Sequence, residues 1–171
     1  GANNGDNPRP ARVLGDNGFI DIQASMHHTC ARKANGTLWC WGYNNVGALG
    51  DGSTTNRNRP VQVVGVNDAT ALALPAYYMS CALRAGERMW CWGYNEFGHV
   101  GDGTTNNRLV PVQVRGLGRV KHMARGALGY SNYAVTEDNE TYAWGYNTYG
   151  SLGIGARHAQ SYSEPQRITG F

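Results

Sequence analysis

Short runs of alternating apolar and polar residues recur along the chain, and this pattern predicts β-strands. The first run, 19–24, places Ile20, Ile22 and Ala24 on one face of a strand. No long stretch keeps a 3.6-residue apolar period free of glycine, so a helical bundle is disfavoured. We expect three sets of four strands, at 19–24, 29–33, 37–41 and 59–64, then at 69–74, 80–84, 88–92 and 110–114, and last at 120–125, 132–136, 141–144 and 165–168.

These three sets follow an internal repeat. The sequence Trp-Gly-Tyr-Asn begins at Trp41, Trp92 and Trp144, at spacings of 51 and 52 residues. A glycine-rich segment and a proline-led strand follow each copy, and no linker separates the units, so we predict one continuous repeat domain. Its parts are the outer-strand remnant of a preceding repeat at 1–14 and three units at 15–65, 66–116 and 117–171.

Four short strands in about fifty residues are typical of one blade of a β-propeller. The predicted fold class is therefore all-β, with blades of four antiparallel strands and about three blades in the chain. The segment HTCARKANGTLWCWGYNNVGALGDGSTTNRNRPVQV resembles the repeat of the regulator of chromosome condensation family, in its bacterial, cysteine-bearing form. This resemblance implies a β-propeller, which in that family usually has seven blades, more than this chain supplies.

Composition narrows the class of partner. Glycine accounts for 24 of 171 residues, about twice its usual share, which agrees with many tight turns. The 15 basic and 12 acidic residues leave a net charge of +3, too small and too scattered to favour nucleic acid or an anionic membrane. No apolar run approaches the ~20 residues of a membrane span. We therefore expect neither a nucleic acid nor a membrane as partner.

Aromatic pairs in the third strand of each unit are predicted to pack between neighbouring blades. Trp39 and Trp41 share one face of their strand, and large side chains suit the gap of ~10 Å between packed sheets. A platform that stacks sugar rings is the alternative, and it requires exposed rings. The equivalent pairs are Trp90 with Trp92 and Tyr142 with Trp144.

Two cysteine pairs share the same spacing on the arms of the central hairpins. If residues 34–36 form a three-residue turn with Gly36 in the left-handed conformation, Cys30 lies directly opposite Cys40. Cys81 and Cys91 have the same relation in the second unit.

The third unit lacks both members of the pair. Tyr133 and Ala143 take their positions, a large residue facing a small one, and Asn139 takes the position of Gly36. This joint loss favours the disulfides Cys30–Cys40 and Cys81–Cys91 over four buried thiols. Disulfides indicate an oxidising compartment, here extracellular or periplasmic.

Catalytic and metal-binding patterns do not stand out. The sequence has no G-x-S-x-G, H-E-x-x-H or Walker motif, and the pair His27-His28 is not repeated, so we expect a surface polar pair there. Asp51 and Asp102 lie in Gly-Asp-Gly turns, but the acidic ligand pattern of a calcium loop is absent. Nine residues between paired cysteines do not match a zinc knuckle. We expect no enzyme activity, no cofactor and no bound metal.

Binding residues on a rigid propeller are expected on loops at one face. Two sets of loop positions differ between the units while remaining largely aromatic: the connection between the first and second strands, and the pair after each Trp-Gly-Tyr-Asn. Tyrosine offers a large amphipathic contact and is favoured at interfaces. The candidate binding residues are His27, His28, Tyr77, Tyr78, Glu96, Phe97, Tyr130 and Tyr149.

These features predict a non-catalytic module that binds another protein. A carbohydrate-binding, lectin-like propeller that uses Tyr77, Tyr78 and Tyr130 as stacking surfaces is the alternative. The resembled family includes an exchange factor for a small GTPase and bacterial inhibitors of β-lactamases, but only the scaffold motif matches here. Three blades form an open arc with Trp-rich end faces, so we expect a homodimer that closes the ring, with a piece of a longer propeller as the other reading.

Overall fold

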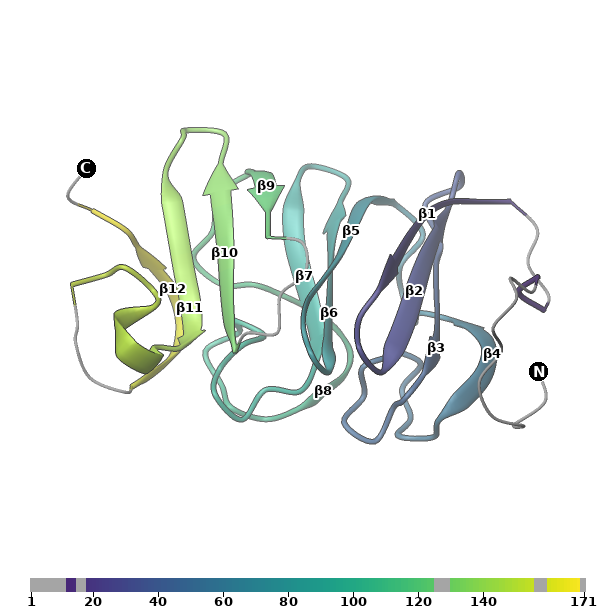
Figure 1. Ribbon diagram of the computed structural model, residues 1–171. Helices are drawn as coiled ribbons and strands as arrows, with labels where there is room; N and C mark the ends of the chain where they lie inside the picture. The colour runs from purple at the N-terminus through teal and green to yellow at the C-terminus, as the bar shows by residue number, and fades with distance from the viewer. Residues whose placement is uncertain (1–11, 15–17, 125–129, 156–159, 170–171) are drawn as a thin grey trace.

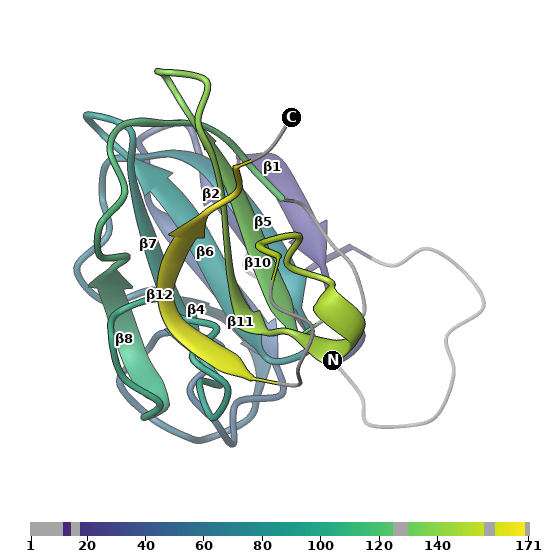
Figure 2. The ribbon, with the colours of Figure 1, turned by 90° about the vertical axis from the view of Figure 1, so that its left-hand side faces the viewer.

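The computed structural model describes residues 12–14, 18–124, 130–155 and 160–169, which form three antiparallel sheets of four strands each. The sheets stand side by side, and the chain completes one before it enters the next (Figure 1). Viewed along this row, the outer strands β4, β8 and β12 lie on one side of the molecule, and β1 and β5 lie on the other (Figure 2). The prediction of an all-β chain with three four-stranded blades is confirmed.

Each blade takes its strands in chain order, with every neighbour antiparallel. Blade 1 consists of β1 (Phe19–Ala24), β2 (His28–Lys33), β3 (Leu38–Gly42) and β4 (Arg57–Gln62). Blade 2 consists of β5 (Ala69–Ala76), β6 (Met79–Arg84), β7 (Arg88–Gly93) and β8 (Arg108–Gln113). Blade 3 consists of β9 (Val120–Met123), β10 (Ser131–Thr136), β11 (Thr141–Tyr146) and β12 (Ser161–Arg167), with the short 3-10 helix η1 (Thr148–Gly150) before β12.

The outer strands begin earlier than predicted. We expected them to start at their proline or one residue before it, at Arg59, Val110 and Pro165. The backbone instead pairs Arg57 with Gly42 and Arg108 with Gly93, past a bulge in the ladder. The bulge separates these first pairs from the rest of the ladder, and the apolar pattern does not reveal it. The predicted strand 120–125 ends at Met123, and residue 125 lies outside the described residues.

The hydrophobic core lies between the blades. One cluster joins Leu38 and Leu49 of blade 1 to Trp92 of blade 2, and the other joins Val100 of blade 2 to Trp144 of blade 3. Both indoles are fully buried, which confirms the predicted packing role for these two rings.

Each buried indole also donates a hydrogen bond to the preceding blade. Trp92 Nε1 donates to the carbonyl of Ala48 at 3.0 Å, and Trp144 Nε1 donates to the carbonyl of His99 at 2.8 Å. A buried indole N–H needs such a partner. Trp41, on the outer side of blade 1, is only half-buried and stacks on Phe19 with ring centroids 6.1 Å apart.

The glycine-rich loops let neighbouring blades approach closely. Gly101 has a φ of +77°, and a Cβ placed there would lie 2.7 Å from Trp144 Nε1. Gly50 has the same relation to Trp92, at 2.7 Å. Glycine is therefore required by both the backbone conformation and the space against the indole.

The central hairpins have the predicted register. Cys30 pairs directly with Cys40, and Cys81 pairs with Cys91, each pair at disulfide-bonding distance. Gly36 has a φ of +78°, as the predicted three-residue turn requires. In blade 3, Tyr133 lies opposite Ala143, and Asn139 has a φ of +58°.

Two further expectations concern the N-terminal region. Ile20 and Ile22 do share a face of β1, and that face is exposed, at 58% and 54%. The predicted outer-strand remnant at 1–14 lies largely outside the described residues, and residues 12–14 are not in a strand. No helix in the described part of the chain is long and apolar enough to cross a membrane.

Candidate functional site

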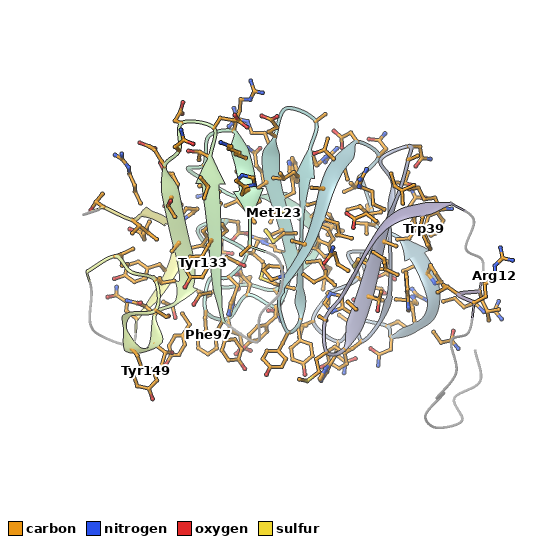
Figure 3. The ribbon with its side chains drawn as sticks, turned by 45° about the horizontal axis from the view of Figure 1, so that its top comes forward. Arg12, Trp39, Phe97, Met123, Tyr133 and Tyr149 are labelled. Atoms are coloured by element: carbon orange, nitrogen blue, oxygen red, sulfur yellow. A yellow bond between two sulfur atoms is a disulfide. The ribbon has the colours of Figure 1, made fainter. Side chains whose placement is uncertain are left out.

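Aromatic rings from all three blades gather at one edge of the molecule, where the connection after each first strand meets the end of each third strand. Phe97 and Tyr149 mark this edge in Figure 3. We call the connected set of rings at this edge the aromatic strip, which consists of His27, Tyr43, Tyr77, Tyr78, Tyr94, Phe97, Tyr130 and Tyr146.

The first half of the strip joins blades 1 and 2. The His27 ring meets Tyr78 edge-on, with centroids 4.9 Å apart, and Tyr43 lies 4.8 Å from Tyr78. Tyr77 lies 6.1 Å from Tyr78 and 6.0 Å from Tyr130 of blade 3. Tyr77 therefore links the two halves of the strip.

Phe97 is the centre of the second half. Its ring lies 4.9 Å from Tyr146, 5.7 Å from Tyr130 and 6.2 Å from Tyr94. Phe97 itself is half-buried, whereas Tyr130 is 43% exposed. The strip is thus a contiguous surface rather than a closed core, and it brings together the predicted residues His27, Tyr77, Tyr78, Phe97 and Tyr130.

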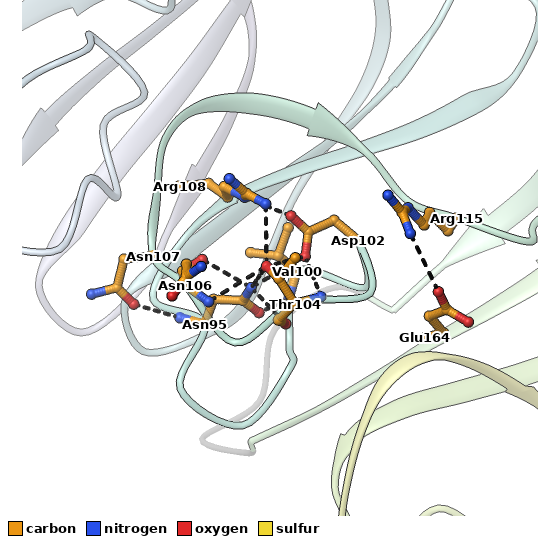
Figure 4. A network of polar contacts seen from close by, with 9 residues as sticks. All are labelled: Asn95, Val100, Asp102, Thr104, Asn106, Asn107, Arg108, Arg115 and Glu164. Carbon is orange, nitrogen blue, oxygen red and sulfur yellow. Dashed lines mark hydrogen bonds and ion pairs between the residues drawn. The ribbon is translucent and has the colours of Figure 1, made fainter.

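Buried asparagines hold the loops that carry this surface. Asn95, the last residue of Trp-Gly-Tyr-Asn in blade 2, is fully buried, and its Oδ1 accepts a hydrogen bond from the N–H of Val100 at 2.8 Å. Its Nδ2 donates to the carbonyls of Thr104 and Asn106, both at 3.0 Å (Figure 4). Asn44 and Asn147 accept the equivalent bonds from Leu49 and Leu152. These asparagines were not predicted as functional, although their recurrence in all three repeats was a signal.

The Gly-Asp-Gly carboxylates complete the same loops. Asp102 accepts hydrogen bonds from Thr104 N and Oγ1 at 3.0 and 2.8 Å and forms an ion pair with Arg108 (Figure 4). Burial alone would raise the pKa of Asp102, but the hydrogen bonds from Thr104 and Arg108 outweigh it and lower the pKa. Asp51 has the same relation to Ser53 and Arg57. These contacts support the predicted structural turn.

His28 does not lie on the surface, so the expectation of an exposed histidine pair was wrong for this residue. Its ring is 2% exposed, with Nδ1 2.8 Å from Ser25 Oγ and Nε2 2.9 Å from Ser80 Oγ of blade 2. Because Ser80 Oγ donates to the carbonyl of Ala48, it accepts from Nε2–H, which fixes the tautomer. Burial, with a smaller contribution from the charge of neighbouring His27, lowers the pKa of His28 to about 4.

A second buried histidine, His99, lies beneath the strip and was missed in the sequence. It is 1% exposed and contacts the rings of Tyr94, Phe97 and Tyr130, with centroids 5.5 to 5.6 Å away. Neither ring nitrogen has a hydrogen-bond partner among the described residues. Burial lowers the pKa of His99 to about 4, so the ring is neutral at physiological pH.

Glu96 is exposed beside Phe97, and its carboxylate accepts a hydrogen bond from Tyr94 Oη at 2.8 Å. Burial and this carboxylate raise the pKa of Tyr94 to about 12, so the hydroxyl remains a donor. Glu96 forms no ion pair with any residue that the structure describes.

Tyr149 stands apart from the strip. It is 98% exposed on η1, has a φ of +57°, and borders an open groove of about 420 Å³. Tyr130 and Tyr146 of the strip also border this groove, together with Tyr133. The groove therefore adjoins the strip at blade 3, and the residues bordering it carry hydroxyl groups but no charge.

Three ring residues of the strip were not predicted: Tyr43, Tyr94 and Tyr146. Each is the tyrosine of a Trp-Gly-Tyr-Asn repeat. Positions that repeat from unit to unit were expected to stabilise the blade rather than to bind a partner. These three side chains nevertheless remain half-exposed at the blade edge. Within the described ranges, no group of three or more His, Cys, Asp or Glu side chains is placed to hold a metal ion.

Comparison with known proteins identifies the repeat. The family described as "Regulator of chromosome condensation (RCC1) repeat" matches residues 35–82, 87–128 and 138–171, and a second model of the same repeat matches 19–48. The human E3 ubiquitin-protein ligase HERC2 is 30% identical over 158 residues, covering 86% of this chain and 3% of HERC2. The ultraviolet-B receptor UVR8 of Arabidopsis thaliana is 27% identical over 154 residues, covering 88% of this chain and 34% of UVR8.

Solved structures agree on the fold. Yeast RCC1 (Prp20) bound to Kap60 superposes with a TM-score of 0.79 at 19% identity, over 93% of this chain and 38% of that one. A second structure of Prp20p from Saccharomyces cerevisiae, described with its binding properties to Gsp1p and histones, gives 0.78 at 18% identity, over 93% of this chain and 40% of that one. The chain thus spans well under half the length of each of these proteins.

Proposed function

We propose that this chain, which belongs to the regulator of chromosome condensation (RCC1) repeat family, is a non-catalytic propeller segment that binds another protein through the aromatic strip. The continuity of the strip carries the proposal: rings from three separate blades form one unbroken series of contacts. Contiguous exposed aromatic surface is unusual on a chain that binds nothing. Tyrosine and phenylalanine also supply large contact area at low entropic cost.

The relatives support the class of partner. Yeast RCC1 (Prp20) was solved bound to Kap60, and its binding to Gsp1p and histones is described. Those partners belong to that protein, and the identity of 18–19% carries only the fold to this chain. The proposal for this chain is therefore a protein partner recognised by aromatic surface, without a named identity.

The cysteine pairs support a secreted or periplasmic location. Both pairs are fully buried, directly paired in register and at disulfide-bonding distance. Disulfides persist in oxidising compartments and are rare in the cytosol of most organisms. We propose that the partner is met in such a compartment.

The test is a quantitative binding measurement on strip variants. Proteins from the oxidising compartments of the source are cross-linked to the chain, and a captured protein is purified and titrated against it by calorimetry. The combined change Tyr77→Ala, Tyr78→Ala and Tyr130→Ala should abolish binding, and Tyr130→Ser alone, at the exposed ring, should weaken it at least tenfold, as expected for a hot spot.

The matched control is Phe19→Ala, which removes a half-buried ring at the start of β1, at the opposite end of that strand from the connection that carries His27. It should leave the affinity unchanged. If every strip variant folds and binds with wild-type affinity, the strip is not the binding surface.

Carbohydrate binding is the second candidate, favoured by the groove beside Tyr149. Tyr130, Tyr133, Tyr146 and Tyr149 border it, so it offers ring faces for stacking and hydroxyls for hydrogen bonds. A glycan array separates the two functions. Saturable binding to a glycan that Tyr149→Ser removes would favour this candidate.

The end blades also require partners. Among the residues that the structure describes, Trp41 of blade 1 has no counterpart of the hydrogen bond that Trp92 and Trp144 donate to a preceding blade. We propose that further blades cover this face, supplied by a second copy that closes the ring or by more repeats of a longer chain. Light scattering distinguishes these sources, because a dimer has about twice the mass of 18.6 kDa.

A further inference from the structure

Three aromatic rings pack around the buried ring of His99, and a carboxylate lies beside them. We call this group of side chains the cup; it consists of the rings of Tyr94, Phe97 and Tyr130 packed around His99, and the carboxylate of Glu96, which accepts a hydrogen bond from Tyr94. Aromatic faces carry negative electrostatic potential and attract cations. The carboxylate adds a formal negative charge at the same place.

His99 makes the floor of the cup neutral. The His99 ring is 1% exposed, and neither of its nitrogens has a hydrogen-bond partner among the described residues. Such a buried imidazole is neutral, so it does not repel a cation bound nearby. The equivalent positions in the other blades, Ala48 and Ser151, carry no ring. The cup is therefore specific to blade 2 and its junction with blade 3.

Elsewhere in the described chain, two half-buried tryptophan rings lie next to cations of the chain itself. Lys33 Nζ lies 4.8 Å from the ring of Trp39, and the Arg84 guanidinium lies 4.7 Å from Trp90. The rings of the cup have no such cation among the described residues, and Glu96 has no ion-pair partner there.

We propose that the cup receives a basic side chain of the partner protein, the ammonium group of a lysine or the guanidinium group of an arginine. The cation stacks on the exposed face of Tyr130 and on Phe97, and its charge is balanced by Glu96. This inference deepens the proposed function, because it assigns the chemistry that the strip recognises.

The test uses the whole chain and short probe peptides. Acetylated, amidated Gly-Ser-X-Ser-Gly peptides, with X as lysine, arginine, norleucine or glutamate, are titrated while the ring signals of labelled tyrosine and phenylalanine are followed by NMR. The lysine or arginine peptide should shift the signals of Tyr94, Phe97 and Tyr130 in a saturable way. Norleucine has the aliphatic stem without the charge and should bind at least about threefold more weakly, as expected for an exposed cation–π contact.

The matched variants are Glu96→Gln and Glu137→Gln, which remove an exposed carboxylate of the cup and one away from it, respectively. Glu96→Gln retains an acceptor for Tyr94 and should weaken the cationic peptide about three- to fivefold, whereas Glu137→Gln should not change it. Equal binding of the norleucine peptide, equal loss in both variants, or no saturable shift from either cationic peptide would overturn the inference.

The protein partner separates this inference from the proposed function. Loss of partner binding in the tyrosine variants, combined with wild-type partner binding in Glu96→Gln and no charge preference among the peptides, refutes the cation site alone. Wild-type partner binding in the tyrosine variants refutes the proposed function instead.

Discussion

Mild acid should destabilise this protein through His28 and His99. Burial lowers the pKa of both imidazoles from 6.5 to about 4. Between these two values the unfolded chain binds more protons than the folded chain, so stability falls as the pH decreases. The stability that is present above pH 6.5 is lost progressively as the pH approaches 4.

The size of the effect follows from the shift. For one histidine, the difference in proton binding between pH 7 and pH 5 amounts to about 2 kcal/mol of unfolding free energy, and for both to about 4 kcal/mol. Such a loss is a large part of the stability of an ordinary domain. Asp51 and Asp102 do not interfere, because their pKa values are lowered from 3.8 and their contribution is lost only at more acid pH.

The assay is urea unfolding followed by tryptophan fluorescence at pH 7, 6 and 5, with the cysteine pairs left oxidised. His99→Met is the decisive variant, because the His99 ring has no hydrogen-bond partner to lose, and the main-chain carbonyl still accepts from Trp144 and Asn132. In this variant, the loss of unfolding free energy between pH 7 and pH 5 should be about half of the wild-type loss. His122→Met, at an exposed position on β9, is the control and should keep the wild-type slope. A wild-type slope in His99→Met would refute the reasoning.

Three further predictions concern the scaffold. Asn95→Ala should destabilise the fold by about 2–4 kcal/mol, because it leaves buried loop groups such as the Val100 N–H unpaired, whereas exposed Asn45→Ala should change stability by less than about 0.5 kcal/mol; urea unfolding measures both. Gly101→Ala and Gly116→Ala both place a methyl group at a positive φ, but only the methyl group at 101 would meet Trp144. Thermal unfolding should therefore show that Gly101→Ala is less stable than Gly116→Ala by about 2 kcal/mol or more. Thiol titration of the denatured, unreduced chain should find no free thiols, and four titratable thiols would contradict both disulfides and the oxidising compartment.

Features that depend on neighbours in the chain could be predicted from the sequence. The hairpin turn at Gly36 sets the register of its strands, and this places Cys30 opposite Cys40 across only ten positions. The repeat period likewise defines the blades, because each four-stranded sheet is built from one continuous segment. The boundaries of β4, β8 and β12 were less accurate, because their first residues pair beyond a shift in the ladder that the residue pattern does not reveal.

The site depends on how the blades stack, which the sequence of one unit does not reveal. His28 is buried because Ser80, fifty-two residues away, comes from the next blade to pair with it. Phe97 meets Tyr130 and Tyr146 only because blade 3 packs against blade 2. The sequence by itself determined the strands, the blades and the cysteine pairing, since these rest on local turns and on a fixed period. The tertiary structure alone decided which rings form one surface and which histidines lose water, because both result from packing between units about fifty residues apart.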